Sequence, residues 1–425
     1  MVKMRRFGGW GGLVLGLCLL LMVPAPAAAA EKKSDVLISG TYDLTGPYSG
    51  VHQLFVKAAK DYVQWSNETN QIPGVNIVLD VVDIAADPGK TVVAFQMAAS
   101  KTPRAVISTG GFASHCTIAC KPLAQRLKIP IISGSSPRSI LLPPGWVFSI
   151  QGLYEGMLGA CGDWVVANWK PDSKDPWIRK HYEKRNPRMA VIGWDNTFGR
   201  GFDQPESRAY LKSKGVDFVG AEYIPMSPSD TSPVLLRLVK DQKADFIYFG
   251  MYPSSHAVIL KDAGRLGLRD QFQDFAFWAS SILQVKGFAG DLAERSMMLT
   301  GYKMLPEEWD VPYFLEAYKK SGLDLVFGVY YSAAVAYFDV YGEAIKRAAA
   351  KVGPDKVDGQ AIYDVMVSMR NYKPRMFHSV MNFTPTKLYG PDTAVMYQIQ
   401  NGAPVLVDKD IYVPNLLPGG KDVPK

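Results

Sequence analysis

The chain has 425 residues, of which 48% are hydrophobic and 20% are charged, a composition that excludes a disordered chain and allows one or two globular domains. Its formal net charge is +7, and no dense cluster of Lys and Arg accompanies it. The most basic run, residues 170–188, also contains Asp172, Asp175 and Glu183. We expect this run to be a solvated connector, and the charge pattern excludes a nucleic-acid-binding face.

Residues 1–30 have the three parts of a secretory signal peptide. "MVKMRR" carries three positive charges, "LVLGLCLLLMV" is an apolar run too short to span a bilayer, and "PAPAAAA" offers an A-x-A cleavage site. The alternative is a stop-transfer helix. Removal of the peptide lowers the formal charge from +7 to +4, because Lys3, Arg5 and Arg6 leave with it. The mature protein is therefore expected to be soluble and exported to the periplasm.

From residue 36 onward, short β-rich runs alternate with amphipathic segments of helical length. The first series predicts strands at 36–42, 75–83, 104–109 and 129–134 and helices at 51–67, 88–100 and 114–127. The second series predicts strands at 188–194, 216–224, 244–250 and 272–278 and helices at 202–213, 231–241 and 254–266. This alternation predicts two α/β lobes, each with a mostly parallel sheet flanked by helices. A long helix near 329–350 and a Tyr- and Pro-rich tail complete the chain.

The loops that follow the carboxyl ends of parallel strands line the ligand crevice of such a fold. Here these loops are rich in small, hydroxyl and aromatic residues: "DLTGPYSG", "STGGFASHCT", "SGSSPRS", "WDNTFGRG", "FGMYPSS" and "FWASS". Glycines let the backbone approach a ligand, and Ser114 can cap a helix whose free N–H groups favour an anion. Ser114 could be a helix cap only. The second hydroxyl loop, residues 133–136, lies beside it in the same predicted sheet and favours a ligand site.

These segments, in this order, resemble the branched-chain amino acid binding proteins of bacterial ABC importers, which have the type I periplasmic binding fold. The similarity extends from about residue 36 to residue 302 and more loosely to the tail. It implies two lobes joined by a hinge of three crossovers that close on a small molecule and deliver it to a membrane permease. The implied lobes are residues 31–152 with 302–378, and residues 153–301 with 379–411, followed by a tail at 412–425.

The resemblance also implies ligand-binding residues. Ser114 matches the family serine that binds the ligand carboxylate, and Ser135 and Ser136 match the loop that adds a second hydroxyl and backbone contacts. Phe198 matches an aromatic position of the family, and Tyr252 matches the tyrosine wall of the second lobe.

Two departures from the family pattern change the expected ligand. Ala86 and Ala113 stand where the family commonly has a disulfide. Trp278 or a neighbour stands where the amino acid binders hold the ligand ammonium with an acidic residue, and no Asp or Glu lies between Asp274 and Asp291. A buried ammonium without a carboxylate is costly. We therefore expect an aromatic or aliphatic carboxylate rather than an α-amino acid, walled by Phe112, Phe198, Tyr252 and Trp278.

Catalytic and metal motifs are weak. Cys116, Cys120 and Cys161 allow at most one disulfide and are expected to be buried structural residues, and the five histidines have no metal-ligand spacing. "DPGKT" at 87–91 lacks the glycine of a phosphate-binding loop at Ile84. Ser114 and His115 point about 100° apart on a helix, which argues against a serine–base pair.

The sequence therefore predicts a binding protein without cofactor, metal or catalytic residues. Its partners would be a small-molecule ligand and an ABC permease, and we expect a monomer. Two alternatives stay open: an exported hydrolase on the same scaffold, which needs a nucleophile–base pair in the crevice, and a periplasmic sensor that reports to a membrane receptor.

Overall fold

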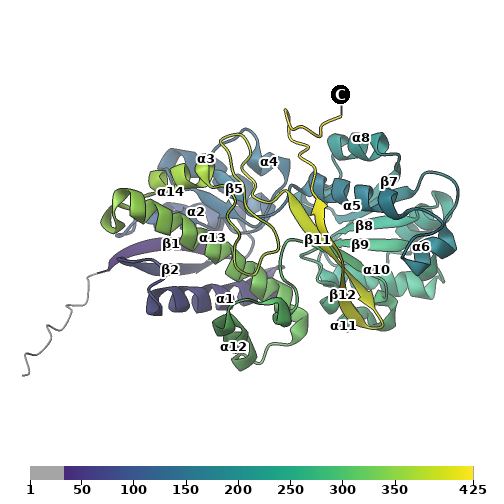
Figure 1. The fold of residues 1–425 in the computed structure, drawn as a ribbon, viewed down its shortest axis with the longest axis horizontal. Helices are drawn as coiled ribbons and strands as arrows, with labels where there is room; N and C mark the ends of the chain where they lie inside the picture. Colours follow the sequence, from purple (N-terminus) through teal and green to yellow (C-terminus); the bar gives the residue numbers. More distant parts are fainter. Residues whose placement is uncertain (1–32, 425) are drawn as a thin grey trace, which may run out of the picture. The chain divides into compact units, whose positions relative to one another are not determined.

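The computed structural model describes residues 33–424, so the predicted signal peptide lies outside the described residues (Figure 1). Five parallel strands form sheet A in the order β2-β1-β3-β4-β5. Their bounds are β1 Ser34–Tyr42, β2 Val75–Asp83, β3 Ala105–Ser108, β4 Ile131–Ser133 and β5 Val147–Ser149.

Sheet B has seven strands in the order β12-β11-β10-β9-β8-β6-β7, and only β11 runs antiparallel to both of its neighbours. Its strands are β6 Arg188–Trp194, β7 Asp217–Ile224, β8 Phe246–Gly250, β9 Gln273–Phe277, β10 Met297–Thr300, β11 Thr393–Gln400 and β12 Ala403–Tyr412. The central strands are buried along their whole length, which explains their continuous apolar sequences.

Helices connect the strands and cover the sheets. Their bounds are α1 Ser49–Glu68, α2 Pro88–Ser100, α3 Ser114–Leu127, α4 Arg138–Leu141, α5 Tyr154–Asn168, α6 Pro176–His181, α7 Thr197–Arg200, α8 Pro205–Ser213, α9 Ser232–Leu235, α10 Pro253–Arg265, α11 Ile282–Ala289, α12 Pro312–Lys320, α13 Gly328–Val352 and α14 Gly359–Ser368. A π-helical turn, Leu236–Asp241, continues α9, and short 3-10 turns are found at Arg269–Gln271, Gly290–Ala293, Pro306–Glu308, Leu325–Phe327 and Pro354–Lys356.

Several observed elements differ from the predicted ones. Strand β5 and helix α5 were not predicted, and the helix predicted at 231–241 is α9 followed by a π-helical turn. The helix expected at 202–213 begins at Pro205, because proline favours the first helical position and Ser207 Oγ accepts the Gln204 N–H there. The basic connector at 170–188 is not wholly solvated, because it contains α6, whose Trp177 and Ile178 are buried.

The chain passes between the two sheets three times: after β5, after β10, and before β11. This agrees with the two-lobed fold and the three-crossover hinge, while the exact lobe boundaries stay a prediction. Helix α13 packs beside α1 (Figure 1) and buries Tyr330, Tyr331, Tyr337 and Tyr341, of which Tyr341 donates its hydroxyl to the Ile132 carbonyl in β4 of sheet A.

The three cysteines of the described chain are free and buried, as predicted. Burial raises the pKa of the Cys116 thiol to about 11 and that of Cys120 to about 12, so neither is a reactive thiolate near neutral pH. Within residues 33–424, every helix is too short or too polar to cross a membrane.

Candidate functional site

A cavity of about 430 Å³, including its open mouth, lies where the carboxyl ends of strands from both sheets meet. Of the seven predicted site residues, six line it: Phe112, Ser114, Ser135, Phe198, Tyr252 and Trp278. The sequence reasoning missed Tyr48, His52, Phe55, Tyr154, Phe277 and Tyr337, which also line it. Among the described residues, those that line the cavity include no Asp, Glu, Lys or Arg.

The loop between β3 and α3 owes its shape to glycine. Gly110, Gly111 and Phe112 all have positive φ angles, of 63°, 84° and 54°. A Cβ atom at Gly111 would lie 2.7 Å from Cys116 Cβ, so a larger residue does not fit there. This tight turn places the Phe112 ring and the first turn of α3 against the cavity.

Ser114 is not the helix cap that the sequence suggested. Ala113 occupies the N-cap position, and Ser114 is the first helical residue. The Ser114 side chain is buried, and its hydroxyl has no hydrogen-bond partner within the described chain. The first N–H groups of a helix also lack intrahelical partners, so the start of α3 offers a free hydroxyl together with free amides.

The second serine loop, residues 133–136, links the neighbouring loops by hydrogen bonds. Ser135 Oγ donates to the Phe112 carbonyl at 2.6 Å and so ties the β4 loop to the β3 loop. Ser136 Oγ donates at 2.5 Å to the carbonyl of Gly152, in the β5–α5 connection. Ser136 is not among the residues that line the cavity, so its part in ligand binding stays a prediction.

Aromatic rings form the walls on both sides. Tyr48 of the β1 loop meets Tyr252 of the β8 loop edge to face, with ring centroids 5.5 Å apart. Phe55 of α1 lies nearly parallel to Trp278 of the β9 loop, at 6.2 Å and 12°. These ring pairs connect the parts of the cavity that belong to sheet A and sheet B, and they favour a ligand with an apolar body.

The polar groups of the cavity converge on Tyr154. Burial raises the pKa of the Tyr154 phenol, and the side chains of Ser114, Ser135 and Gln151 and the Ser136 backbone oppose that rise. Tyr154 lies shortly after β5, a strand of only three residues that the sequence pattern did not predict, so the rule about strand carboxyl ends did not identify it.

The ionisable groups at this site are neutral or already paired. Burial lowers the pKa of His52 to about 3, and its Nδ1 accepts the Asp43 N–H at 2.9 Å. The Asp43 carboxylate accepts the amides of Gly46 and Tyr48 at 2.5 and 2.7 Å, so it holds its own loop in place. A ligand that enters this cavity therefore meets dipoles and rings rather than full charges.

A Ser–His–Asp chain lies behind the β9 loop. His256 Nδ1 lies 3.0 Å from Ser280 Oγ, and His256 Nε2 lies 3.0 Å from Asp274 Oδ2. All three side chains are fully buried, and Ser280 does not line the cavity. A hydrolase needs its serine exposed to substrate, so this chain does not supply the nucleophile that the hydrolase alternative requires.

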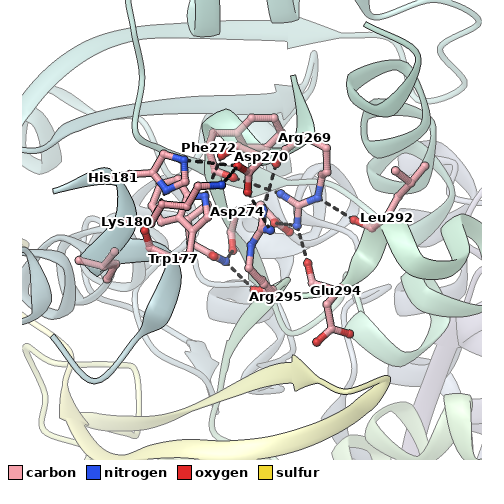
Figure 2. Close-up of polar contacts among 12 residues, drawn as sticks. Trp177, Lys180, His181, Arg269, Asp270, Phe272, Asp274, Leu292, Glu294 and Arg295 are labelled. Atoms are coloured by element: carbon pink, nitrogen blue, oxygen red, sulfur yellow. Dashed lines mark hydrogen bonds and ion pairs between the residues drawn. The ribbon is translucent and has the colours of Figure 1, made fainter. Parts of the chain in front are cut away.

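The same chain anchors the second-lobe wall. Arg269 Nη2 donates to Asp274 Oδ1 at 2.7 Å, and Figure 2 shows these two residues within a wider network with Asp270 and Arg295. Burial alone would raise the pKa of Asp274, but Arg269 and His256 outweigh it and hold the pKa well below its usual range. The ionised Asp274 carboxylate thus holds His256, and His256 in turn contacts Ser280. Ser280 lies two residues after Trp278 in the sequence.

Two α/β sheets joined by three crossovers, with a cavity at their facing strand ends, define a binding protein of the type I periplasmic class. The periplasmic binding protein family model matches residues 36–403, and the chain belongs to this family. Family membership makes it a binding protein rather than an enzyme and indicates a periplasmic location.

Named relatives are distant. The Leu/Ile/Val-binding protein BraC3 of Rhizobium johnstonii is 22% identical over 264 residues, 61% of this chain and 67% of that protein. The Leu/Ile/Val-binding protein of Citrobacter freundii is 22% identical over 286 residues, 67% of this chain and 71% of that protein.

Solved structures share the fold. A branched-chain amino acid ABC transporter protein from Thermus thermophilus with bound valine has a TM-score of 0.73 and 22% identity, covering 90% of this chain and 98% of that chain. A fatty acid ABC transporter substrate-binding protein from Thermomonospora curvata has a TM-score of 0.71 and 17% identity, covering 93% of this chain and 96% of that chain. Identities this low show the fold and leave the ligand to be argued from the cavity.

A buried carboxyl group lies near the predicted site. Glu155 in α5 is fully buried, and neither of its oxygens has a hydrogen-bond partner within the described chain. Arg138 Nε in α4 lies 3.6 Å from it, and the same guanidinium pairs with Glu206 in α8. Burial raises the pKa of Glu155 from 4.5 to about 7; Arg138 opposes this rise, and Glu206 adds to it.

We predict that Glu155 makes stability depend on pH. Its folded pKa lies above its unfolded value, so its protonation stabilises the fold below pH 4.5, and this contribution is lost as the pH rises through 7. The shift corresponds to about 3 kcal/mol of unfolding free energy. Urea unfolding of the mature protein between pH 4.5 and 8 measures this pH dependence of the unfolding free energy. Glu155→Gln should flatten the profile, whereas the exposed control Glu316→Gln should retain it; an unchanged slope in Glu155→Gln would contradict the assignment.

Proposed function

We propose that this chain is the exported solute-binding component of an ABC importer and captures a small carboxylate-bearing ligand with an aromatic or aliphatic body. The observation that carries the proposal is the buried, unpartnered hydroxyl of Ser114 in an aromatic cavity that has no charged lining residue in the described chain. A buried polar group without a partner costs free energy, and a ligand acceptor removes that cost.

The start of α3 supports a negatively charged ligand group. Free amides at a helix N-terminus favour an anion, and Ser114 and the Tyr154 phenol can both donate to the same oxygen atoms. The cavity offers no carboxylate for an ammonium group, so acids without an ammonium are preferred to α-amino acids. One structural neighbour holds valine and another is a fatty acid ABC transporter substrate-binding protein, and valine and fatty acids have a carboxylate in common.

Ligand capture would proceed by closure of the two lobes. A ligand that contacts Ser114 on one side and Tyr252 on the other favours the closed state, which a permease can recognise. The sequence-based expectations of a cleaved signal peptide, a permease partner and a monomer belong to this proposal. Neither a cofactor nor a nucleic acid has a role in it.

A matched ligand panel tests the ligand class. Phenylacetate and 4-methylpentanoate should raise the melting temperature of the purified mature protein more than phenylalanine and leucine do, because an ammonium finds no counter-charge. A ligand at 100 times its Kd adds about 2.7 kcal/mol to the unfolding free energy. Stronger stabilisation by leucine than by 4-methylpentanoate would overturn the argument from the missing carboxylate.

Ser114→Ala tests the anion-binding residue. A hydrogen bond to a charged group contributes about 1.5–3 kcal/mol, so phenylacetate should bind on the order of 10- to 100-fold more weakly by calorimetry. Ser136→Ala is the matched control, because that hydroxyl bonds Gly152 outside the cavity and its loss should leave the affinity nearly unchanged. Equal effects of the two substitutions would remove Ser114 from the site.

A further inference from the structure

An ion-pair cluster near the ligand cavity joins elements of sheet A to elements of sheet B. Arg138 begins α4, which follows β4 of sheet A, and it lies three residues after Ser135 of the cavity lining. Its two carboxyl partners lie on helices of the other side. Glu206 belongs to α8, between β6 and β7 of sheet B, and Glu155 belongs to α5, which packs against α8 and β12. One guanidinium therefore contacts groups that the other sheet positions.

The contacts of this guanidinium are partly shielded from water. The Arg138 side chain is 20% exposed, its Nε lies 3.6 Å from Glu155 Oε1, and its Nη1 contacts Glu206 Oε2. Glu155 is fully buried, and Glu206 is 30% exposed. Salt and water screen partly buried pairs less than pairs on an open surface. A guanidinium has five N–H donors in a planar fork, so it can serve two carboxyl groups at once, which the point charge of a lysine does less well.

A second pocket lies at the boundary that Arg138 crosses. Pro137 and Ser139 line it with Arg138 from the side of sheet A, and Thr197 and Gln204 line it from the side of sheet B. Its volume is about 390 Å³, including its open mouth. Side chains therefore do not fill this boundary, and the ion pairs can form and break there without disruption of a packed core.

The serine loop is joined to the first crossover by hydrogen bonds. Ser136 Oγ donates to the Gly152 carbonyl, and the Tyr154 N–H donates to the Ser136 carbonyl at 3.3 Å. Both partners lie between β5 and the start of α5, so these bonds do not reach α8. Arg138, two residues after Ser136, extends the connection from this loop to α8, whose position depends on sheet B.

We propose that Arg138 is a positioning residue for ligand capture: together with Glu155 and Glu206 it forms an ion-pair latch that holds the serine loop against the sheet B side in the closed state. This inference rests on the proposed function, because it concerns the state that retains the ligand. Arg138 does not line the ligand cavity, so it acts through the position of the loop and not by contact with the ligand. Loss of the latch should favour the open state and thereby weaken ligand binding.

Chemical cross-linking tests the latch without a ligand. Ser139→Cys and Gln204→Cys place thiols on the two sides of one pocket, and the native thiols of the described chain are buried. A short bifunctional thiol reagent can join them only when the two sides are close, so the rate reports the population of the closed state. Arg138→Gln and Glu206→Gln should each lower this rate on the order of five- to tenfold, between the effects of exposed and of buried charge pairs.

Arg208→Gln is the matched control for these substitutions. Arg208 also pairs with a carboxylate, but Arg208 lies on α8 and its partner Asp203, at 2.6 Å, lies on the same side of the boundary. Arg208→Gln should leave the cross-linking rate unchanged, and Arg138→Lys should retain part of it. Equal rates in the parent protein, Arg138→Gln and Glu206→Gln would overturn the latch. Failure of the two cysteines to cross-link in the parent protein would overturn it as well.

A double-mutant cycle with phenylacetate relates the latch to ligand affinity. Arg138→Gln and Glu206→Gln should each weaken binding on the order of five- to tenfold. The double substitution should weaken binding about as much as one of them, because both break the same pair. Additive effects would overturn the pairing. If phenylacetate does not bind the wild type at millimolar concentration, the carboxylate assignment of the proposed function fails, while the cross-linking rates still decide the latch.

Discussion

The free-energy cost of burying polar groups determines what the cavity can accept. Its walls are aromatic, its ionisable lining residue His52 is held neutral, and no full charge lies on its surface within the described chain. In such surroundings each buried donor must find an acceptor, and each ligand charge must find dipoles or a counter-charge. The free Ser114 hydroxyl and the first amides of α3 can donate to a ligand, and this is the physical basis for proposing a ligand with acceptor oxygens.

The fold could be predicted because its rules are periodic and local. Alternating apolar runs and amphipathic segments predicted both sheets, and the position of loops at strand ends placed six of seven chosen residues around one cavity. The Ser136 hydroxyl could not be excluded in this way, because its partner Gly152 lies in another loop and the bond depends on tertiary packing. Tyr154 was missed because β5 has only three residues, too few for a recognisable strand pattern. Trp278 lines the cavity, but its bond to Gln151 joins residues 127 positions apart and leaves no local pattern.

Charged residues surround the cavity as a second layer that supports the neutral lining. Asp274 is paired with Arg269 and His256 behind the β9 loop, and Arg138 is paired with Glu155 and Glu206 near the β4 loop. Pairing lets these groups stay buried without projecting a net charge into the ligand space. Burying such ion pairs costs desolvation free energy that hydrophobic replacements would avoid. Their benefit is therefore that they orient the loops, rather than that they stabilise the fold.

The neutral cavity lining and the charged pairs behind it bear on how the ligand could be selected when the lobes close. Ser114 follows a strand of sheet A and Trp278 follows a strand of sheet B, and both line the cavity, so a ligand there can contact both sheets. In the proposed closure, a ligand that lacks an acceptor gains the contacts with the rings but leaves the Ser114 hydroxyl unpaired, so it would stabilise the closed state less than a ligand with an acceptor oxygen.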